Sequence, residues 1–465
     1  MSSTDLALMA HLLRRAGFGA TRGDLESYTS RSYEQVVDDL LHPERFPEID
    51  EDVLNRYYSG LNSWEPISVY SGAWIYRMIN TRRPLQEKMA LFWHHIFATG
   101  FHKSEHTPSL VRQIDTFRSN GFSNMRDILL DLSRDPAMID WLDNEENHKH
   151  EINENFGREL LELFSMGVGN YTEDDIKAAS RAFTGWTFRQ PIPIYPFGHH
   201  IAEFVYLEDD HDDSEKTFLG HTGRFNGEDI IDIVVRQPAT ANFICRHLYN
   251  FFVADEPQVP AWQVVPPQDP AAIETLTRAY IESDGEIGSV LKALFRSEFF
   301  KQARGKKVKS PTEIVVGAAK LAGVQRFPDP GLTELGEAAA VMGQFLYNAP
   351  TVEGWHTGKE WVDGGTLNER VNFAVNLVAD ATQPGIQEII EGVRGSGAPL
   401  SPGEFVDRCL DQAGALEVSE STRSAMVHSA ESAGELRFDG ETGQASSHVV
   451  QMLQLIVSST EYQFA

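Results

Sequence analysis

Apolar residues recur every three or four positions through most of the 465-residue chain. This spacing gathers them on one face of an α-helix, so it predicts helices rather than a sheet. The clearest expected helices span residues 84–98, 151–166, 238–253, 311–322 and 366–381. Strand patterns are few, and the best is residues 204–207 with residues 186–188 as a partner. We therefore expect an all-α, predominantly helical fold with a small β insertion near residues 186–220.

Glycine and proline divide this helical pattern. A stretch rich in both, residues 383–401, interrupts it late in the chain. We expect a helical core over residues 1–300, a helical segment over residues 301–382 that packs on the core, and a C-terminal helical extension over residues 383–465. Ser310-Pro311 and Ser401-Pro402 each predict a helix start, because serine caps a helix and proline suits its first position.

Charge and cysteine content exclude several classes of protein. The formal net charge is −28, which disfavours non-specific binding to nucleic acid, since phosphates repel an acidic protein. Cys245 and Cys409 are too few for a disulfide framework, and we expect Cys245 to be a buried thiol. No apolar stretch is long enough to span a membrane. The first arginines follow the N-terminal apolar stretch, the reverse of a secretory signal, so we expect a cytoplasmic protein.

The motifs of the commonest enzyme classes are absent from the sequence. There is no phosphate-binding GxxxxGK[ST] loop, no GxGxxG after a strand, no GxSxG elbow and no HExxH helix. What remains is a set of polar residues in four aromatic-rich segments. We call them the His94 helix (residues 87–97), the NEN segment (148–167), the HDD loop (211–223) and the EGW loop (348–373).

The first two segments each allow a structural and a functional interpretation. In the His94 helix, Glu87 and His94 lie two turns apart on one face, so they are either a buried hydrogen-bonded pair or part of a site. In the NEN segment, an apolar stripe that includes Phe156 and Leu160 faces away from Glu159 and Glu162. The polar face is either solvated, as on any amphipathic helix, or a row of carboxylates that lines a cleft.

The other two segments are equally open. The HDD loop could bind a divalent ion or be an ordinary polar turn. The EGW loop holds two tryptophans that could stack on a ligand or cover the core. As candidates for acid–base catalysis or metal binding we select Glu159, Glu154, Glu162, His94 and His211. As substrate-binding candidates we select Asn153, Asn155, Arg158, Asp212, Lys216, Trp355 and Arg370.

The same segments resemble, in order, the bacterial domain-of-unknown-function 1800 family over about residues 8–380. The matching stretches are Phe92-Trp93-His94, Asp135-Pro136-Ala137-Met138, residues 153–164, Gly167, Tyr171-Thr172-Glu173, residues 181–186, His211-Asp212, residues 216–220, Glu353-Gly354-Trp355, Arg370 and Asn372-Phe373. One departure is Ile96, where the family tends to have a second histidine. The resemblance implies no settled activity. It implies bacterial relatives that are often exported and often encoded beside a sulfatase- or phosphatase-related protein.

Three functions are compatible with these residues. The first is an enzyme with a Glu/His/Asn/Arg site between helices, which hydrolyses or modifies a polar substrate such as a saccharide or an ester. Its chemistry would be acid–base or assisted by a divalent metal. The second is a non-catalytic maturation or assembly partner of the sulfatase- or phosphatase-like neighbour. The third is a haem protein that uses His94, although a CxxCH attachment motif is absent.

Overall fold

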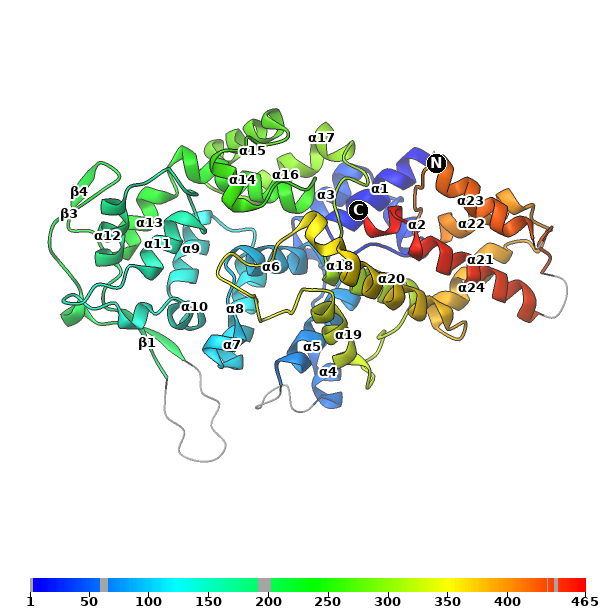
Figure 1. The fold of residues 1–465 in the computed structure, drawn as a ribbon, viewed down its shortest axis with the longest axis horizontal. Coiled ribbons are helices and arrows are strands. Elements are labelled where there is room, and N and C mark those ends of the chain that lie inside the picture. Colours follow the sequence, from blue (N-terminus) through cyan, green and yellow to red (C-terminus); the bar gives the residue numbers. More distant parts are fainter. Residues whose placement is uncertain (1–2, 59–65, 191–201, 433, 439–441) are drawn as a thin grey trace.

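The computed structural model describes residues 3–58, 66–190, 202–432, 434–438 and 442–465. Helices dominate, as predicted (Figure 1). The helices are α1 (Ser3–Arg15), α2 (Arg22–Tyr28), α3 (Tyr33–Leu40), α4 (Glu51–Tyr57), α5 (Ile67–Asn80), α6 (Pro84–Ile96), α7 (Phe101–Ser104), α8 (Thr107–Asn120), α9 (Met125–Ser133), α10 (Pro136–Trp141), α11 (Asn155–Glu162), α12 (Glu173–Ala182), α13 (Gly227–Val234), α14 (Pro238–Phe252), α15 (Pro270–Glu282), α16 (Ile287–Arg296), α17 (Glu298–Lys301), α18 (Pro311–Ala322), α19 (Leu332–Val341), α20 (Gly364–Ala379), α21 (Pro384–Arg394), α22 (Pro402–Gln412), α23 (Glu420–Glu431) and α24 (Thr442–Ser458). Within the described ranges, no helix is long and apolar enough to cross a membrane.

Two small antiparallel hairpins interrupt the helices. The first pairs β1 (Trp186–Arg189) with β2 (Glu203–Tyr206), and Trp186 lies opposite Tyr206. This confirms the predicted insertion, although residues 191–201 within it lie outside the described part of the chain. The second hairpin pairs β3 (Lys216–Phe218) with β4 (His221–Gly223), and the sequence analysis missed it because its strands are only three residues long.

The helix starts agree with their sequence signals. The Ser310 side chain accepts a hydrogen bond from the backbone N–H of Glu313, and the Glu313 carboxylate accepts one from the backbone N–H of Ser310. Pro311 is the first residue of α18. Ser401 and Glu404 do the same at the start of α22. The 383–401 stretch was predicted to interrupt the helical pattern, yet α21 occupies most of it. An apolar stripe of α21, including Ile386 and Ile390, is buried and stabilises this helix.

A single large hydrophobic cluster links the three predicted parts of the chain. It includes Phe92 from the first part, Val315 from the second and Ile386 from the third. α5 packs on α19, α18 on α20, and α20 on α24. The division of the chain at residues 300 and 382 stays a prediction.

The EGW loop, drawn in yellow between α19 and α20, runs back toward α6 (Figure 1). Gly354 makes this contact, because a Cβ at that position would lie 2.3 Å from the carbonyl oxygen of His95. Its φ of +79° also favours glycine, the residue that adopts a left-handed conformation without strain. The contact places the EGW loop beside the His94 helix.

Candidate functional site

The NEN segment forms a shorter helix than the predicted 151–166. α11 begins at Asn155, so the first half of the motif precedes it. Asn153 fixes the turn that precedes α11. Its side chain accepts from the backbone N–H of Asn155 at 3.0 Å and donates to the carbonyl of Asp143 at 3.2 Å. Its own N–H donates to Asn147. The hydrogen bonds of Asn153, which we expected to bind substrate, therefore fix the start of α11.

Arg158 forms ion pairs with two carboxylates, those of Glu154 and of Glu173 on α12. It donates to both carboxylate oxygens of Glu173, at 2.9 and 3.1 Å, and to Glu154 at 3.3 Å. The hydrogen bond to Glu173 raises the pKa of the Arg158 guanidinium further above its ordinary value. Glu154 and Arg158 thus form an ion-paired group at the start of α11.

Glu159 has a different environment. Among the described residues, its carboxylate has no hydrogen-bond or ion-pair partner. Burial raises the pKa of Glu159 to about 7, and the negative charges of Glu162 and Glu353 add to this rise against the opposing effect of Arg158. Glu162 follows one helical turn later and accepts a hydrogen bond from the Tyr171 hydroxyl at 3.1 Å. We call Glu159, Glu162 and Glu353 the carboxylate trio.

Two of the trio line a cleft between α11, α14 and the EGW loop. Glu162 and Glu353 both border this cavity of about 570 Å³. Its walls combine aromatic rings with amide side chains, a lining that is common in sites for polar organic ligands. The polar and aromatic side chains of this lining include Asn170, Asn242, Phe243, Arg246, Trp262 and Gln263.

A second, smaller cavity of about 30 Å³ shares one wall with this cleft. Glu353 borders both, together with Leu163, Val259 and Pro260. The small cavity is also lined by His95, His247, Asn250, Trp355 and His356. Trp355, which we expected to bind substrate, stacks on the His95 ring at 6.2 Å between centroids.

Two histidines in this small cavity carry ring nitrogens without partners. Nδ1 of His95 and Nε2 of His247 are buried and form no hydrogen bond within the described structure. Burial lowers the pKa of His95 to about 4 and lowers that of His247 well below its ordinary value. Both rings are therefore neutral at pH 7 and present a donor or an acceptor to a ligand.

Arg246 is the cation nearest this wall of the cleft. Its guanidinium donates to Glu256 at 2.6 and 2.9 Å and lies 4.5 Å from the centroid of the Trp262 ring. Because its guanidinium is hydrogen-bonded to Glu256, Arg246 holds Trp262 in place and forms no ion pair with the trio.

His94 does not line either of these cavities. Its Nε2 accepts the backbone N–H of Tyr347 at 2.9 Å, its side chain is fully buried, and burial lowers its pKa to about 3. Glu87, the expected partner of His94, instead accepts from Trp74 and Arg118. The histidine of this helix that borders a cavity is the next one, His95.

The HDD loop is paired within itself and with α12. Asp212 accepts from Arg181 at 2.7 Å and from the Ser214 backbone at 2.9 Å. Lys216 donates to the carbonyls of Asp212 and Ser214, and His211 lies against the carbonyl of Thr184. None of the HDD residues borders the cleft.

Arg370 also lies apart from the cleft. It is fully buried and donates to the side chain of Gln463 and to the carbonyl of Lys309. The structure therefore brings together the end of the NEN segment, His95 and the start of the EGW loop. The HDD loop and Arg370 lie elsewhere.

Sequence reasoning did not select His95, His247 or Glu353 as site residues. Glu353 lies in the EGW loop, directly before the glycine that contacts His95, and His95 lies next to His94. Glu353 and His95 therefore lay within segments that the sequence had already indicated. His247 carried no signal, because it lies on an ordinary apolar helix. Within the described residues, no group of three or more His, Cys, Asp or Glu side chains is arranged to hold a metal ion. Cys245 and Cys409 are both free and buried, as expected for Cys245.

Glu159 itself borders neither cavity, whereas Glu162 and Glu353 border the cleft. The chemistry open to this group of carboxylates is proton transfer. A carboxyl that keeps its proton near neutral pH, beside carboxylates that repel its charged form, is the arrangement from which acid and base roles arise. Neutral imidazoles, amides and aromatic rings would orient a polar ligand beside it.

Comparison with known proteins gives the family and leaves the chemistry open. Neither curated proteins nor solved structures provide a match. The model of the family described as "Protein of unknown function (DUF1800)" matches residues 11–464. Since that match covers nearly the whole length, including every segment discussed above, the chain belongs to the DUF1800 family.

Proposed function

We propose that this protein is an enzyme that uses the carboxylate trio for general acid–base hydrolysis of a polar, uncharged substrate. The observation that carries the proposal is the trio itself: three carboxylates from two distant segments, two of them bordering a cleft of about 570 Å³. A fold gains no stability by gathering like charges, so such a cluster is typical of a site.

The three carboxyls have separable roles in this proposal. Glu159 is the acid, because burial and its neighbours hold its pKa at about 7. Glu162 or Glu353, which border the cleft, is the base that activates water. Glu154, the other candidate of this helix, is ion-paired with Arg158 and takes no part.

The lining of the cleft favours a saccharide or a similar neutral polyhydroxy compound. The trio repels anionic substrates, while Asn242 and Gln263 offer both hydrogen-bond donors and acceptors and Asn170 offers its side-chain oxygen as an acceptor. Trp262 adds an aromatic face of the kind on which apolar faces of sugar rings pack. The partner-protein and haem interpretations stay predictions.

The proposal is tested by turnover of a panel of 4-nitrophenyl glycosides and 4-nitrophenyl esters. We expect glycoside turnover by the wild type and a loss of about 10²- to 10⁴-fold in Glu159→Gln and in Glu353→Gln, the usual contribution of general acid–base catalysis. Glu151→Gln is the matched control, because Glu151 is exposed beside the same helix. Equal rates for the wild type, Glu159→Gln and Glu353→Gln, or no turnover of any compound, would contradict the proposal.

A further inference from the structure

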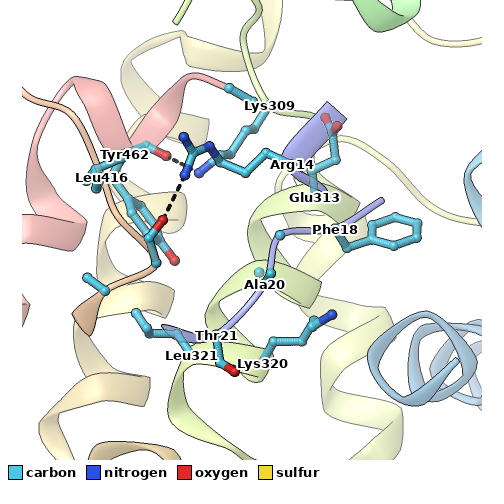
Figure 2. A pocket seen from close by; sticks show the side chains of 15 residues that line it. Arg14, Phe18, Ala20, Thr21, Lys309, Glu313, Lys320, Leu321, Leu416 and Tyr462 are labelled. Atoms are coloured by element: carbon cyan, nitrogen blue, oxygen red, sulfur yellow. Dashed lines mark hydrogen bonds between the residues drawn. The ribbon is translucent and has the colours of Figure 1, made fainter. Parts of the chain in front are cut away.

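A second charged cavity, of opposite sign, lies between α1, α18 and the C-terminal part of the chain. Arg14 from α1, Lys309 before α18 and Lys320 from α18 all line it, and its volume is about 60 Å³. In Figure 2 the ends of Arg14 and Lys309 lie close together beside Tyr462, and Lys320 lies on the other side. The cavity has several times the roughly 10–15 Å³ that a single water molecule needs.

Glu313, an acidic residue that lines this cavity, forms ion pairs with two buried cations, Arg15 and Lys88. It accepts from the Arg15 guanidinium at 3.0 Å and from the Lys88 ammonium, and both of those cations are fully buried. These two charges lower the pKa of Glu313 far below its ordinary value, although burial opposes them. Glu313 still raises the pKa of Lys309, but its ion pairs are made with Arg15 and Lys88 and not with the cations that line the cavity.

Arg14 and Lys309 have no carboxylate partner within ion-pair distance among the described residues. Each is held by a backbone carbonyl instead: Arg14 donates to Gly414 at 3.1 Å, and Lys309 donates to Tyr462 at 2.7 Å. Carbonyls orient these cations but do not neutralise them. Lys309 is buried and Arg14 is half-buried. The charges of Glu313 and Glu417 act on Lys309 and Arg14, respectively, from beyond ion-pair distance. Buried charges in proteins are normally paired directly, so two cations that face one cavity without an ion pair call for a physical reason.

A fourth cation, Arg370, lies behind Lys309 and outside the lining of the cavity. Arg370, which is fully buried, donates to the carbonyl of Lys309, and its NH1 atom has no hydrogen-bond partner within the described structure. Burial and the nearby charge of Arg14 lower the pKa of Lys309 to about 7. Burial likewise lowers the pKa of Arg14 to about 10. The fold would gain stability if an anion entered.

We propose that this cavity binds a small tetrahedral oxyanion, phosphate, between the guanidinium of Arg14 and the ammonium of Lys309. A guanidinium donates two parallel hydrogen bonds to phosphate oxygens, and an ammonium adds a compact positive charge. The bound anion would supply the missing negative charge. It would also tie α1 and α18 to the C-terminal segment through Gly414 and Tyr462.

The net charge of −28 makes this cavity an exception on an acidic protein. The overall field repels anions, so binding depends on these particular side chains. The same chemistry fits free phosphate or the phosphate group of an ester. An adjoining cavity of about 340 Å³ shares Arg14, Leu416 and Ala465 with the first and offers room for the rest of an ester.

The test is the melting temperature in potassium phosphate against potassium chloride of equal ionic strength. We expect phosphate to raise the melting temperature of the wild type by about 2 °C or more at concentrations far above Kd, since a ligand that binds only the folded state stabilises it. Arg14→Gln and Lys309→Met should lose this rise. Lys309→Met should also melt above the wild type in chloride, because it removes a buried cation that has no ion-pair partner.

Lys306→Gln is the matched control, since Lys306 is exposed three residues before Lys309 and should keep the full rise. Glycerol 3-phosphate distinguishes the two sources: a larger rise than with phosphate assigns an ester, and an equal or smaller rise assigns the free anion. If the variants do not fold, calorimetric titration of wild type and Arg14→Lys with phosphate decides, with about tenfold weaker binding expected for Arg14→Lys. A wild-type rise no greater than in chloride, or an undiminished rise in Arg14→Gln and Lys309→Met, would overturn the proposal.

Discussion

The HDD loop and the carboxylate trio are both acidic motifs, yet their charges are arranged in opposite ways. In the loop, Asp212 meets Arg181 at 2.7 Å and Asp213 meets Arg224 at 2.9 Å. In the trio, the side chains of Glu159 and Glu353 lack such partners within the described structure, and each carboxylate repels its neighbours. The ion pairs in the loop stabilise the turn, whereas the carboxylates of the trio repel one another.

The same contrast appears in the pKa directions. Hydrogen bonds from Arg181 and Ser214 lower the pKa of Asp212 far below its ordinary value, although burial opposes them. Burial and like charges raise the pKa of Glu159 to about 7. The two motifs are both rich in carboxylates, but they differ in the balance of charge around each carboxylate.

The largest expected effect comes from breaking the paired side of this comparison. Asp212→Asn should lower the free energy of unfolding by about 2–3 kcal/mol, because a partly buried Arg181 loses its carboxylate and charged hydrogen bonds are lost. The measurement is urea unfolding at pH 7. Asp213→Asn is the control, since Asp213 is 71% exposed and should change stability by less than about 0.5 kcal/mol. Equal losses in the two variants would show that the pair with Arg181 is not structural.

The next effect should have the opposite sign. Glu159→Gln should stabilise the protein above pH 7 by about 1–2 kcal/mol, a value reduced for partial solvent screening. The folded state keeps the Glu159 proton up to pH about 7, whereas the unfolded chain releases it near its ordinary value of 4.5. Between those values the folded state binds more protons, so wild-type stability falls as the pH rises.

Unfolding of wild type and Glu159→Gln across pH 4 to 8 measures this effect. The two proteins should agree at pH 4 and separate between pH 4.5 and 7, with no further separation above pH 7. Glu151→Gln, at an exposed position, should follow the wild type throughout. A Glu159→Gln variant that is less stable than the wild type at pH 8 would mean that Glu159 contributes to the fold rather than to a site.

The sequence predicted the helices well because their information is local. The apolar spacing and the Ser-Pro caps of α18 and α22 need only a few neighbouring residues. The surroundings of the candidate site residues were harder to predict, because long-range contacts decide them. His94 was selected as catalytic, but its Nε2 accepts the N–H of Tyr347, 253 positions away.

The candidate site was predicted in part for the same reason. Glu159 and Glu162 lie on one helix face, and periodicity alone placed them together. The third carboxylate, Glu353, is placed near them because Gly354 packs against the carbonyl of His95. No local sequence pattern predicts this long-range contact. In the HDD loop, the partner that neutralises Asp212 is Arg181, 31 positions earlier. Sequence reasoning therefore could not tell the balanced motif from the unbalanced one.

The smallest expected effect tests whether the trio acts as one electrostatic unit. Glu353→Gln removes a negative charge that raises the pKa of Glu159 while leaving burial unchanged. We expect the pKa of Glu159 to fall by about half a pH unit, because a like charge several ångströms away disfavours ionisation only modestly in a partly solvated cleft. NMR titration of the glutamate side-chain carboxyl carbons measures this pKa directly, with Glu159→Gln identifying the resonance.

The matched control is Glu360→Gln. Glu360 is an exposed charge in the same loop that pairs with His356, so its loss should leave the Glu159 titration unchanged. High salt should shrink the difference between wild type and Glu353→Gln, since screening weakens charge repulsion but not burial. A Glu159 titration that is identical in wild type and Glu353→Gln would remove the EGW loop from the site and leave burial on α11 as the sole cause of the raised pKa.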